Sequence, residues 1–182
     1  AVVNLFKKEN VPYYVIGNGS NLLVGDGGYR GVVIQICKNM NKIRVEDDMV
    51  YAQAGALLSK TAAQALEHAL TGMEFASGIP GTLGGAVMMN AGAYGGEMKH
   101  ILYNVLALTK DGEFRVVPAD RMELGYRSSV FDKNGDIVLS AQLKLQPGDP
   151  EKIRAYMEEL KEKRVTKQPL EYPSAGSTFK RP

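Results

Sequence analysis

Residues 75–97 read FASGIPGTLGGAVMMNAGAYGGE, and this glycine-rich stretch decides which kind of fold the chain can adopt. From Gly78 onward four glycines recur at spacings of three, three and one, which predicts small residues along one side of a short helix beginning at Pro80. Backbone without side chains can approach a flat or charged ligand, and the amino end of a helix favours anionic oxygens. Close packing of a helix on a sheet would need the same small residues, so both interpretations remain open.

A second glycine-rich stretch, GNGSNLL at 17–23, follows a predicted buried strand at 12–16. Successive backbone N–H groups and polar side chains in such a loop suit a pyrophosphate. The spacing does not fit the Rossmann fingerprint, because Leu22 stands where the third glycine would be. It does not fit a Walker loop either, because no Gly-Lys-Ser/Thr follows. A plain tight turn is the alternative interpretation of this loop.

Glycine is concentrated in these two stretches. The chain has 182 residues, of which 20 are glycine, with six between Gly17 and Gly31 and eight between Gly72 and Gly96. Hydrophobic residues make up 45% and charged residues 23%, ordinary values for a globular domain, which argue against a disordered or collagen-like chain. Two glycine clusters on such a scaffold predict loops built around a ligand, with a phosphate-bearing molecule as the first expectation.

Charge, hydropathy and cysteine content argue against several classes of protein. The net charge is +2 with dispersed Lys and Arg, so we expect no nucleic-acid partner. No run approaches the roughly 18 apolar residues of a membrane span. A lone cysteine, Cys37, cannot form an internal disulfide and suits a reducing cytoplasm. His68 and His100 lack cysteine partners, so no metal site is predicted.

Alternation and helical periodicity predict hairpins and a few helices. The predicted helices lie at 1–9, at about 57–70 with Gly72 as the stop, and from Asp149-Pro150 to before Pro169. The predicted strands lie at 12–16, at 32–36, at 43–54 with a turn at Asp47-Asp48, at 103–117 with a turn at 110–112, and at 137–146. This mixture indicates an α+β fold rather than a regular βαβ winding. The chain begins at Ala1 within a helical pattern and ends at Pro182 after a motif-like string, so we expect a piece of a longer protein.

Four motifs stand in the order of one enzyme family: GNGSNLL at 17–23, GIPGTLGGAVMMNAGAYGGE at 78–97, YRSSVF at 126–131 and SAGSTFKRP at 174–182. Together they resemble the UDP-N-acetylenolpyruvoylglucosamine reductases. These flavoenzymes complete UDP-N-acetylmuramic acid in bacterial peptidoglycan synthesis, and so serve cell-wall formation, cell shape and cell division. The short interval between the last two motifs resembles the family's shorter type, which lacks an inserted tyrosine-bearing loop.

The resemblance implies a vanillyl-alcohol-oxidase (PCMH-type) FAD-binding fold, in which two α+β lobes hold FAD in a cleft and a substrate-binding domain follows. We expect a partial first lobe at 1–55, a second lobe at 56–147, and a connecting helix with the start of the substrate-binding domain at 148–182. The opening strands of the first lobe would lie outside this chain, as would a catalytic glutamate near the end of the family's proteins. We therefore expect the chain alone to be inactive as a reductase.

The resemblance implies FAD as the cofactor and NADPH as the co-substrate, with no metal ion. The first loop would hold the pyrophosphate of FAD at Gly17, Asn18, Gly19, Ser20 and Asn21. The second stretch would line the flavin side at Ser77, Gly78, Ile79, Pro80, Gly81, Gly84, Gly85, Asn90, Gly92 and Ala93. Ile137 would contact the isoalloxazine through its backbone.

The implied reaction is reduction by NADPH, through FAD, of the enolpyruvyl group on a UDP-sugar to give UDP-N-acetylmuramate. An enol ether accepts hydride poorly unless positive groups hold its carboxylate and stabilise the charge that develops there. Arg127 matches the family's arginine for this role, and a guanidinium suits a carboxylate; a solvated surface pair is the alternative. Ser177 matches the family's proton donor, which can be a weak acid because the intermediate is a strong base; closing the turn at Gly176 is the alternative. Tyr126 and Lys180 are expected as further substrate contacts, although Tyr126 could equally be a core aromatic.

Two other interpretations remain open. A flavin oxidase of the same fold could act on an alcohol or a sugar, although YRSSVF and GSTF count against it. The chain could also be a stable core that binds FAD weakly or not at all. For the main interpretation we expect a UDP-sugar substrate, a cytoplasmic location and a monomer, without nucleic-acid or membrane partners.

Overall fold

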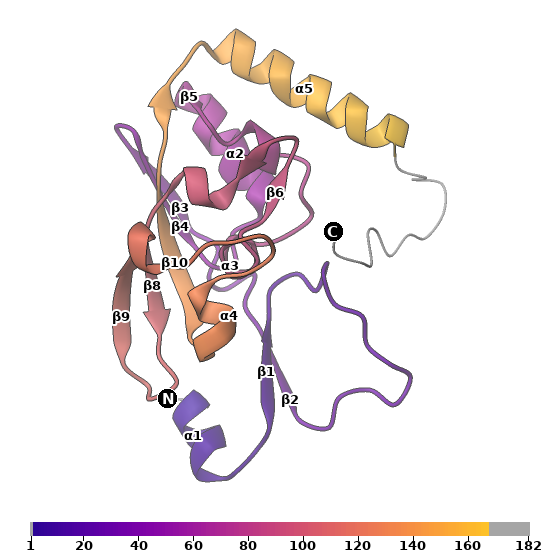
Figure 1. Ribbon diagram of the computed structural model, residues 1–182, viewed down its shortest axis with the longest axis vertical. Helices are drawn as coiled ribbons and strands as arrows, with labels where there is room; N and C mark the ends of the chain where they lie inside the picture. Colours follow the sequence, from indigo (N-terminus) through magenta and orange to yellow (C-terminus); the bar gives the residue numbers. More distant parts are fainter. Residues whose placement is uncertain (1, 168–182) are drawn as a thin grey trace.

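The computed structural model describes residues 2–167, which form a five-stranded antiparallel sheet with helices packed on it and a small parallel sheet beside it (Figure 1). The large sheet has the strand order β3-β4-β10-β8-β9. Its strands are β3 (Ile43–Glu46), β4 (Met49–Gln53), β10 (Ile137–Lys144), β8 (Leu102–Leu108) and β9 (Phe114–Pro118). This combination of hairpins and helices confirms the α+β prediction.

Alternating burial shows that one face of the large sheet is covered. Along β4, Val50 and Ala52 are buried while the residues between them are half-buried, the pattern of a strand with one face on the core. The two predicted hairpins are confirmed, and their turns contain the left-handed residues Asp47 (φ 50°) and Gly112 (φ 87°). Local turn chemistry therefore sets the register of both hairpins.

Four helices accompany the large sheet: α2 (Leu58–Glu67), α3 (Leu83–Met88), α4 (Val130–Asn134) and α5 (Pro150–Lys167). α3 packs against β4 and β10, and α5 packs against α2 and the 3-10 turn η1 (Glu74–Ala76). The fully buried side chains of Leu58, Leu83 and Val87 form the core between these helices and the sheet. α5 begins at Pro150 as predicted, and the Asp149 carboxylate accepts the N–H of Glu151 at 3.0 Å.

The remaining elements of the second half are short. They are β5 (Leu70–Thr71) paired with β11 (Gln146–Pro147), β6 (Gly92–Ala93) paired with β7 (Gly96–Glu97), and the 3-10 turns η2 (Met98–His100) and η3 (Ala119–Arg121). The β6–β7 hairpin turns through Tyr94 and Gly95, which both have positive φ angles. It therefore ends the glycine-rich stretch with a tight reversal of the chain.

The amino-terminal part forms a small unit of its own, with α1 (Val2–Lys8), β1 (Tyr13–Ile16) and β2 (Val32–Gln35). β1 and β2 are parallel, with Tyr13 opposite Val32. Parallel neighbours need a connection that crosses back, and here the irregular segment 17–31 provides it. The first glycine-rich loop therefore leaves the carboxyl end of β1, where parallel strands commonly present a ligand site.

Two predicted boundaries are wrong, and both errors arise from contacts between distant segments. The helix predicted to run to about residue 70 ends at Glu67, because the chain turns at Ala69 (φ 53°) into β5 rather than at Gly72. The helix predicted to begin at Pro80 begins at Leu83. A β-bridge between Leu57 and Thr82 holds residue 82 extended, which delays the helix.

The division into lobes at residues 55 and 147 stays a prediction. The β3–β4 hairpin lies within 1–55, yet β4 pairs with β10 of the large sheet. This pairing favours a first lobe that ends before Ile43. The expected start of a substrate-binding domain after α5 lies outside the described residues.

Candidate flavin site

The two glycine-rich stretches meet in space although they lie 62 residues apart in the sequence. Asn18 Nδ2 donates a hydrogen bond to the Pro80 carbonyl oxygen at 3.0 Å. A methyl group placed on Gly17 would lie 2.1 Å from Thr82 Oγ1, so only a glycine allows this approach. The structure thus brings the pyrophosphate loop expected at 17–21 against the start of the expected flavin wall.

The loop at 17–21 presents unpaired backbone donors. Within the described part of the chain, the N–H groups of Gly19, Ser20 and Asn21 donate to no acceptor. Gly19 has a φ of 72°, a left-handed conformation that lets consecutive N–H groups turn toward one point. Unpaired donors on consecutive residues suit the oxygens of a phosphate group, and phosphate binding by this loop stays a prediction.

Thr82, within the segment expected to line the flavin side, adds a buried hydroxyl. Its side chain is 2% exposed, and Oγ1 has no hydrogen-bond partner among residues 2–167. An unpaired buried hydroxyl costs about 1–3 kcal/mol, so a ligand oxygen there would satisfy a group the protein leaves unsatisfied. In the sequence, the only indication of this hydroxyl is that Thr82 is a lone polar residue between Gly81 and Gly84. The donors of the loop and this hydroxyl together fit a phosphate-bearing cofactor such as FAD.

The amino end of α3 offers fewer free donors than the sequence suggested. The N–H groups of Leu83 and Gly84 donate to the carbonyl oxygens of Ala56 and Ala54, both at 2.8 Å. α3 has only six residues, and its first turn is tied to the loop that follows β4. Of the first three N–H groups of α3, only that of Gly85 donates to no acceptor in residues 2–167, so anion binding at this helix start stays a prediction.

Several glycines of the second stretch serve packing. An added methyl group would lie 2.8 Å from Ala54 Cβ at Gly84, 2.6 Å from the Gly96 carbonyl oxygen at Gly92, and 2.5 Å from the Phe75 ring at Gly96. Each of these distances is shorter than real Cβ contacts allow. The packing interpretation left open by the sequence therefore explains these three glycines. The expected flavin contacts of Gly84 and Gly92 stay predictions beside it.

The other residues expected on the flavin side spread along the same segment. Ser77 Oγ donates to the Glu74 carbonyl oxygen at 2.8 Å and so stabilises the turn before it. Gly78 faces the side chain of Arg164 on α5. Ile137 begins β10, the strand against which α3 packs. Contacts of Ile79, Gly85 and Ala93 with a flavin, like those of the residues above, stay predictions.

Arg127 lies at the tip of a tight turn. Gly125 and Ser128 exchange two backbone hydrogen bonds of 3.1 and 3.3 Å, which places Tyr126 and Arg127 at the tip. Arg127 has a φ of 53°, a strained conformation for a residue other than glycine. Its guanidinium lies 5.7 Å from the centre of the Tyr126 ring and forms no ion pair with a carboxylate among the described residues. A guanidinium without a carboxylate partner in residues 2–167 is available for an anionic ligand.

Of the other expected catalytic and substrate-binding residues, only Tyr126 is among the described residues. Tyr126 is 56% exposed, so the core-aromatic alternative is wrong for it. Ser177 and Lys180 lie outside the described residues. Asn90 is buried beneath the Arg127 turn.

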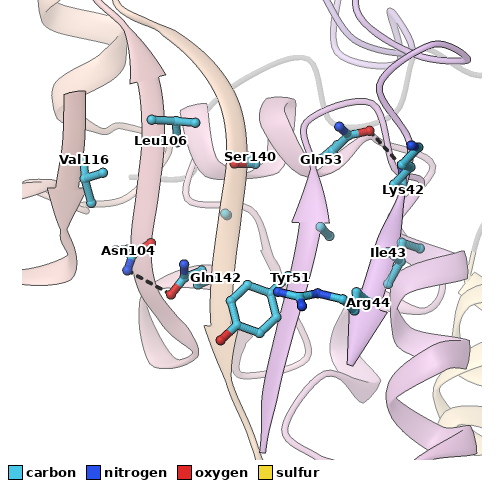
Figure 2. A pocket seen from close by; sticks show the side chains of 12 residues that line it. Lys42, Ile43, Arg44, Tyr51, Gln53, Asn104, Leu106, Val116, Ser140 and Gln142 are labelled. Carbon is cyan, nitrogen blue, oxygen red and sulfur yellow. Dashed lines mark hydrogen bonds between the residues drawn. The ribbon is translucent and has the colours of Figure 1, made fainter. Parts of the chain in front are cut away.

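A separate hollow of the described residues lies on the open face of the large sheet (Figure 2). It measures about 440 Å³ and is lined by both polar and apolar side chains, nearly all of them from the strands of this sheet. Arg44 lies over the Tyr51 ring at 4.5 Å, and Asn104 Nδ2 donates to Gln142 Oε1 at 3.0 Å. No residue of either glycine-rich stretch lines this hollow, so it is not part of the candidate site.

Residues 2–167 contain neither a candidate membrane span nor a cluster of potential metal ligands. No helix there is both long and apolar enough to span a membrane. No three His, Cys, Asp or Glu side chains in the same residues gather where they could hold a metal ion.

Comparison with known proteins identifies the class. The family model for the FAD binding domain matches residues 1–117. The chain belongs to this FAD-binding domain family, which confirms the expected fold class and the expectation of FAD as its cofactor.

Two curated relatives and one solved structure carry the name of the same enzyme. Over 181 residues and 100% of its length, the chain is 55% identical to the UDP-N-acetylenolpyruvoylglucosamine reductase of Clostridium tetani and 52% identical to that of Clostridioides difficile. The crystal structure of UDP-N-acetylenolpyruvylglucosamine reductase (MurB) from Thermus caldophilus matches 98% of the chain with a TM-score of 0.85 and 38% identity. The chain spans 59% and 60% of the two curated relatives and 64% of the crystal structure's chain. The resemblance to this reductase family is therefore confirmed.

Proposed function

We propose that the chain forms the FAD-binding part of an enzyme that uses NADPH to reduce the enolpyruvyl group of a UDP-sugar to UDP-N-acetylmuramate in peptidoglycan synthesis. The observation that carries this proposal is Arg127, a half-buried residue whose guanidinium has no carboxylate partner among the described residues. It lies on a turn attached to the glycine-rich segment. The names of the relatives and their identity along the whole chain support the same reaction.

The residues of the chain would divide the work between binding and charge stabilisation. Loop 17–21 and Thr82 would hold the phosphates of FAD, through unpaired N–H donors and an unpaired hydroxyl. When bound, FAD supplies the chemistry of accepting hydride from NADPH and delivering it to the carbon–carbon double bond. Arg127 would hold the substrate carboxylate and stabilise the negative charge that develops on its oxygens as hydride arrives. The expected proton donor, Ser177, remains a prediction.

The test uses the complete protein, purified and examined for a flavin absorption spectrum. We expect NADPH oxidation that depends on the enolpyruvyl UDP-sugar, and a loss of about 10²-fold or more in kcat for Arg127→Lys, because an ammonium cannot replace a bidentate guanidinium. Arg121→Lys is the matched control, since Arg121 lies exposed in the nearby η3 turn. Colourless protein without such turnover would refute the proposal. Oxygen uptake with an alcohol or a sugar, without NADPH turnover, would favour the oxidase alternative.

We also propose that the enzyme works in the cytoplasm as a monomer on its UDP-sugar substrate. The single cysteine, which cannot form an internal disulfide, supports a reducing compartment. Light scattering of the purified protein tests the oligomeric state, and a mass of two or more subunits would contradict this part of the proposal.

A further inference from the structure

The turn that carries Arg127 is anchored to the end of α3 by two side chains. Ser129 Oγ donates to the Met88 carbonyl oxygen at 2.8 Å, and Asn90 Nδ2 donates to the Gly125 carbonyl oxygen at 3.0 Å. The two bonds hold both sides of the turn on the same short segment of the glycine-rich stretch. A shift of this segment would therefore move the backbone that presents the guanidinium.

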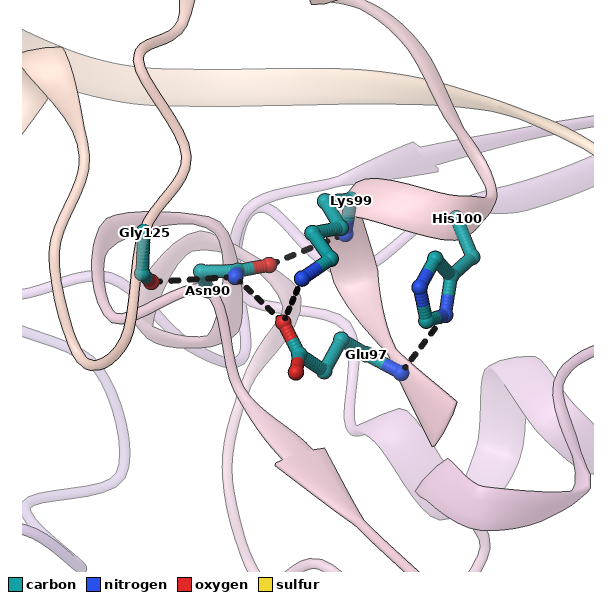
Figure 3. A network of polar contacts seen from close by, with 5 residues as sticks. All are labelled: Asn90, Glu97, Lys99, His100 and Gly125. Carbon is teal, nitrogen blue, oxygen red and sulfur yellow. Dashed lines mark hydrogen bonds and ion pairs between the residues drawn. The ribbon is translucent and has the colours of Figure 1, made fainter. Parts of the chain in front are cut away.

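Hydrogen bonds within the protein occupy most of the Asn90 side chain (Figure 3). Besides its bond to Gly125, Nδ2 donates to Glu97 Oε2 at 2.9 Å, and Oδ1 accepts the N–H of Lys99 at 2.9 Å. Three of the four hydrogen-bonding positions of the amide are thus filled, and the residue is only 3% exposed. This arrangement leaves Asn90 suited to supporting the turn rather than to contacting a flavin through its side chain.

Glu97 and Lys99 determine which way the Asn90 amide points. Lys99 Nζ lies 2.9 Å from Glu97 Oε2, and this hydrogen bond lowers the pKa of the Glu97 carboxyl below its usual 4.5. The carboxylate therefore stays an acceptor, and only the nitrogen of the amide can face it favourably. The second N–H of that nitrogen is then directed at Gly125, as Figure 3 shows.

We propose that Asn90 is a positioning residue for Arg127, and that the Glu97–Lys99 pair holds its amide in the orientation that fixes the turn at 125–128. The proposal rests on the function proposed above for Arg127. Asn90 acts through the backbone of the turn and does not touch the reacting atoms.

The experiment compares Asn90→Ala and Glu97→Gln in the complete, FAD-loaded protein. Asn104→Ala is the control, because Asn104 forms an amide hydrogen bond of the same kind on the open face of the sheet. Hydrogen exchange at the amides of Gly125 and Ser128 reports the turn directly. Rapid-mixing kinetics separately report flavin reduction by NADPH and flavin reoxidation by the enolpyruvyl substrate.

We expect Asn90→Ala to speed exchange at Gly125 and Ser128 about tenfold or more. Flavin reoxidation by the substrate should slow by about 10- to 100-fold, while flavin reduction by NADPH stays within about twofold, because only the reoxidation step uses the arginine. Glu97→Gln should give the same pattern with a smaller effect, and it decides the test if Asn90→Ala fails to fold. The Asn104→Ala control should change neither measurement.

Native exchange at both amides in the variants would overturn the proposal, as would equal slowing of both flavin steps. Failure of the proposed function is distinguishable, because it would show in the unmodified protein as no reoxidation by the enolpyruvyl substrate. The exchange measurement would still decide whether Asn90 holds the turn.

Discussion

A single methyl group at Gly17 should separate the two glycine-rich stretches. In Gly17→Ala the new Cβ would lie 2.1 Å from Thr82 Oγ1, whereas ordinary van der Waals contact begins at 3.4 Å. The contact must therefore open by the difference, about 1.3 Å. Gly17 has no positive φ, so this close approach, not backbone strain, would be the cause of the effect.

The cost follows from how little Thr82 can move. Its side chain is β-branched and 2% exposed, which restricts rotation away from the clash. Overpacking of this kind costs about 1–3 kcal/mol. If the FAD-bound arrangement carries the whole cost, the dissociation constant of FAD rises about 5- to 150-fold. The neighbouring hydrogen bond from Asn18 to Pro80 would weaken with it.

The assay is a titration with FAD followed by flavin fluorescence, paired with urea unfolding. The chain has no tryptophan, so far-ultraviolet circular dichroism is the readout for unfolding. Gly25→Ala is the matched control in the same segment, because no atom lies within 4 Å of a methyl group placed there. We expect the control to bind FAD as the native protein does.

A double substitution tests the physical cause. Thr82→Ala removes the clashing hydroxyl and leaves Cβ at 3.3 Å from the new methyl group, a tight but tolerable contact. The penalty of Gly17→Ala should then shrink, with a coupling of about 1 kcal/mol or more between the two sites. Native FAD affinity in Gly17→Ala, or the same penalty with and without the Thr82 hydroxyl, would refute the reasoning.

Three further predictions concern the same site. Thr82→Val should leave the unfolding free energy of the FAD-free protein unchanged or about 1–2 kcal/mol higher, since it removes an unpaired buried hydroxyl. The affinity for FAD should fall about fivefold, and equal affinity would contradict the role of Oγ1. Arg127→Gly should abolish turnover of the enolpyruvyl substrate. Its unfolding free energy should be unchanged or up to about 1 kcal/mol higher, because glycine accepts a φ of 53° without strain. A large loss of stability in urea unfolding would contradict this prediction. The pKa of Glu97 is lowered in the folded protein, so the stability that this carboxylate contributes is present above the unfolded pKa near 4.5 and is lost as the pH falls through the folded pKa. The native protein should therefore lose more unfolding free energy on acidification than Glu97→Gln. Parallel curves of stability against pH for the two proteins would refute this prediction.

The sequence predicted the local elements of the fold well, for a clear physical reason. The turns at Asp47 and Gly112 and the start of α5 after Asp149 each depend on residues within a few positions of one another. Turn and capping preferences are properties of such short segments, so they can be read from sequence. The four motifs identified the family in the same way, because they are strings of neighbouring residues.

The candidate site could be predicted only in part. The sequence predicted functional roles for loop 17–21 and Arg127, which stay predictions, but it did not indicate the unpaired hydroxyl of Thr82. It also placed Asn90 on the flavin side, whereas the structure engages the Asn90 side chain with Gly125, 35 residues away. Whether a polar atom finds a partner depends on what packs around it, which no local pattern contains.

The sequence by itself determined that glycine would be concentrated in two loops, and which local turns and strands would surround them. Only the tertiary structure decided what each glycine approaches. Gly17 admits the hydroxyl of Thr82, whereas Gly96 admits the ring of Phe75. The physical reason is that glycine's freedom is a local property of the backbone, while the atom that uses the space comes from a segment brought there by folding.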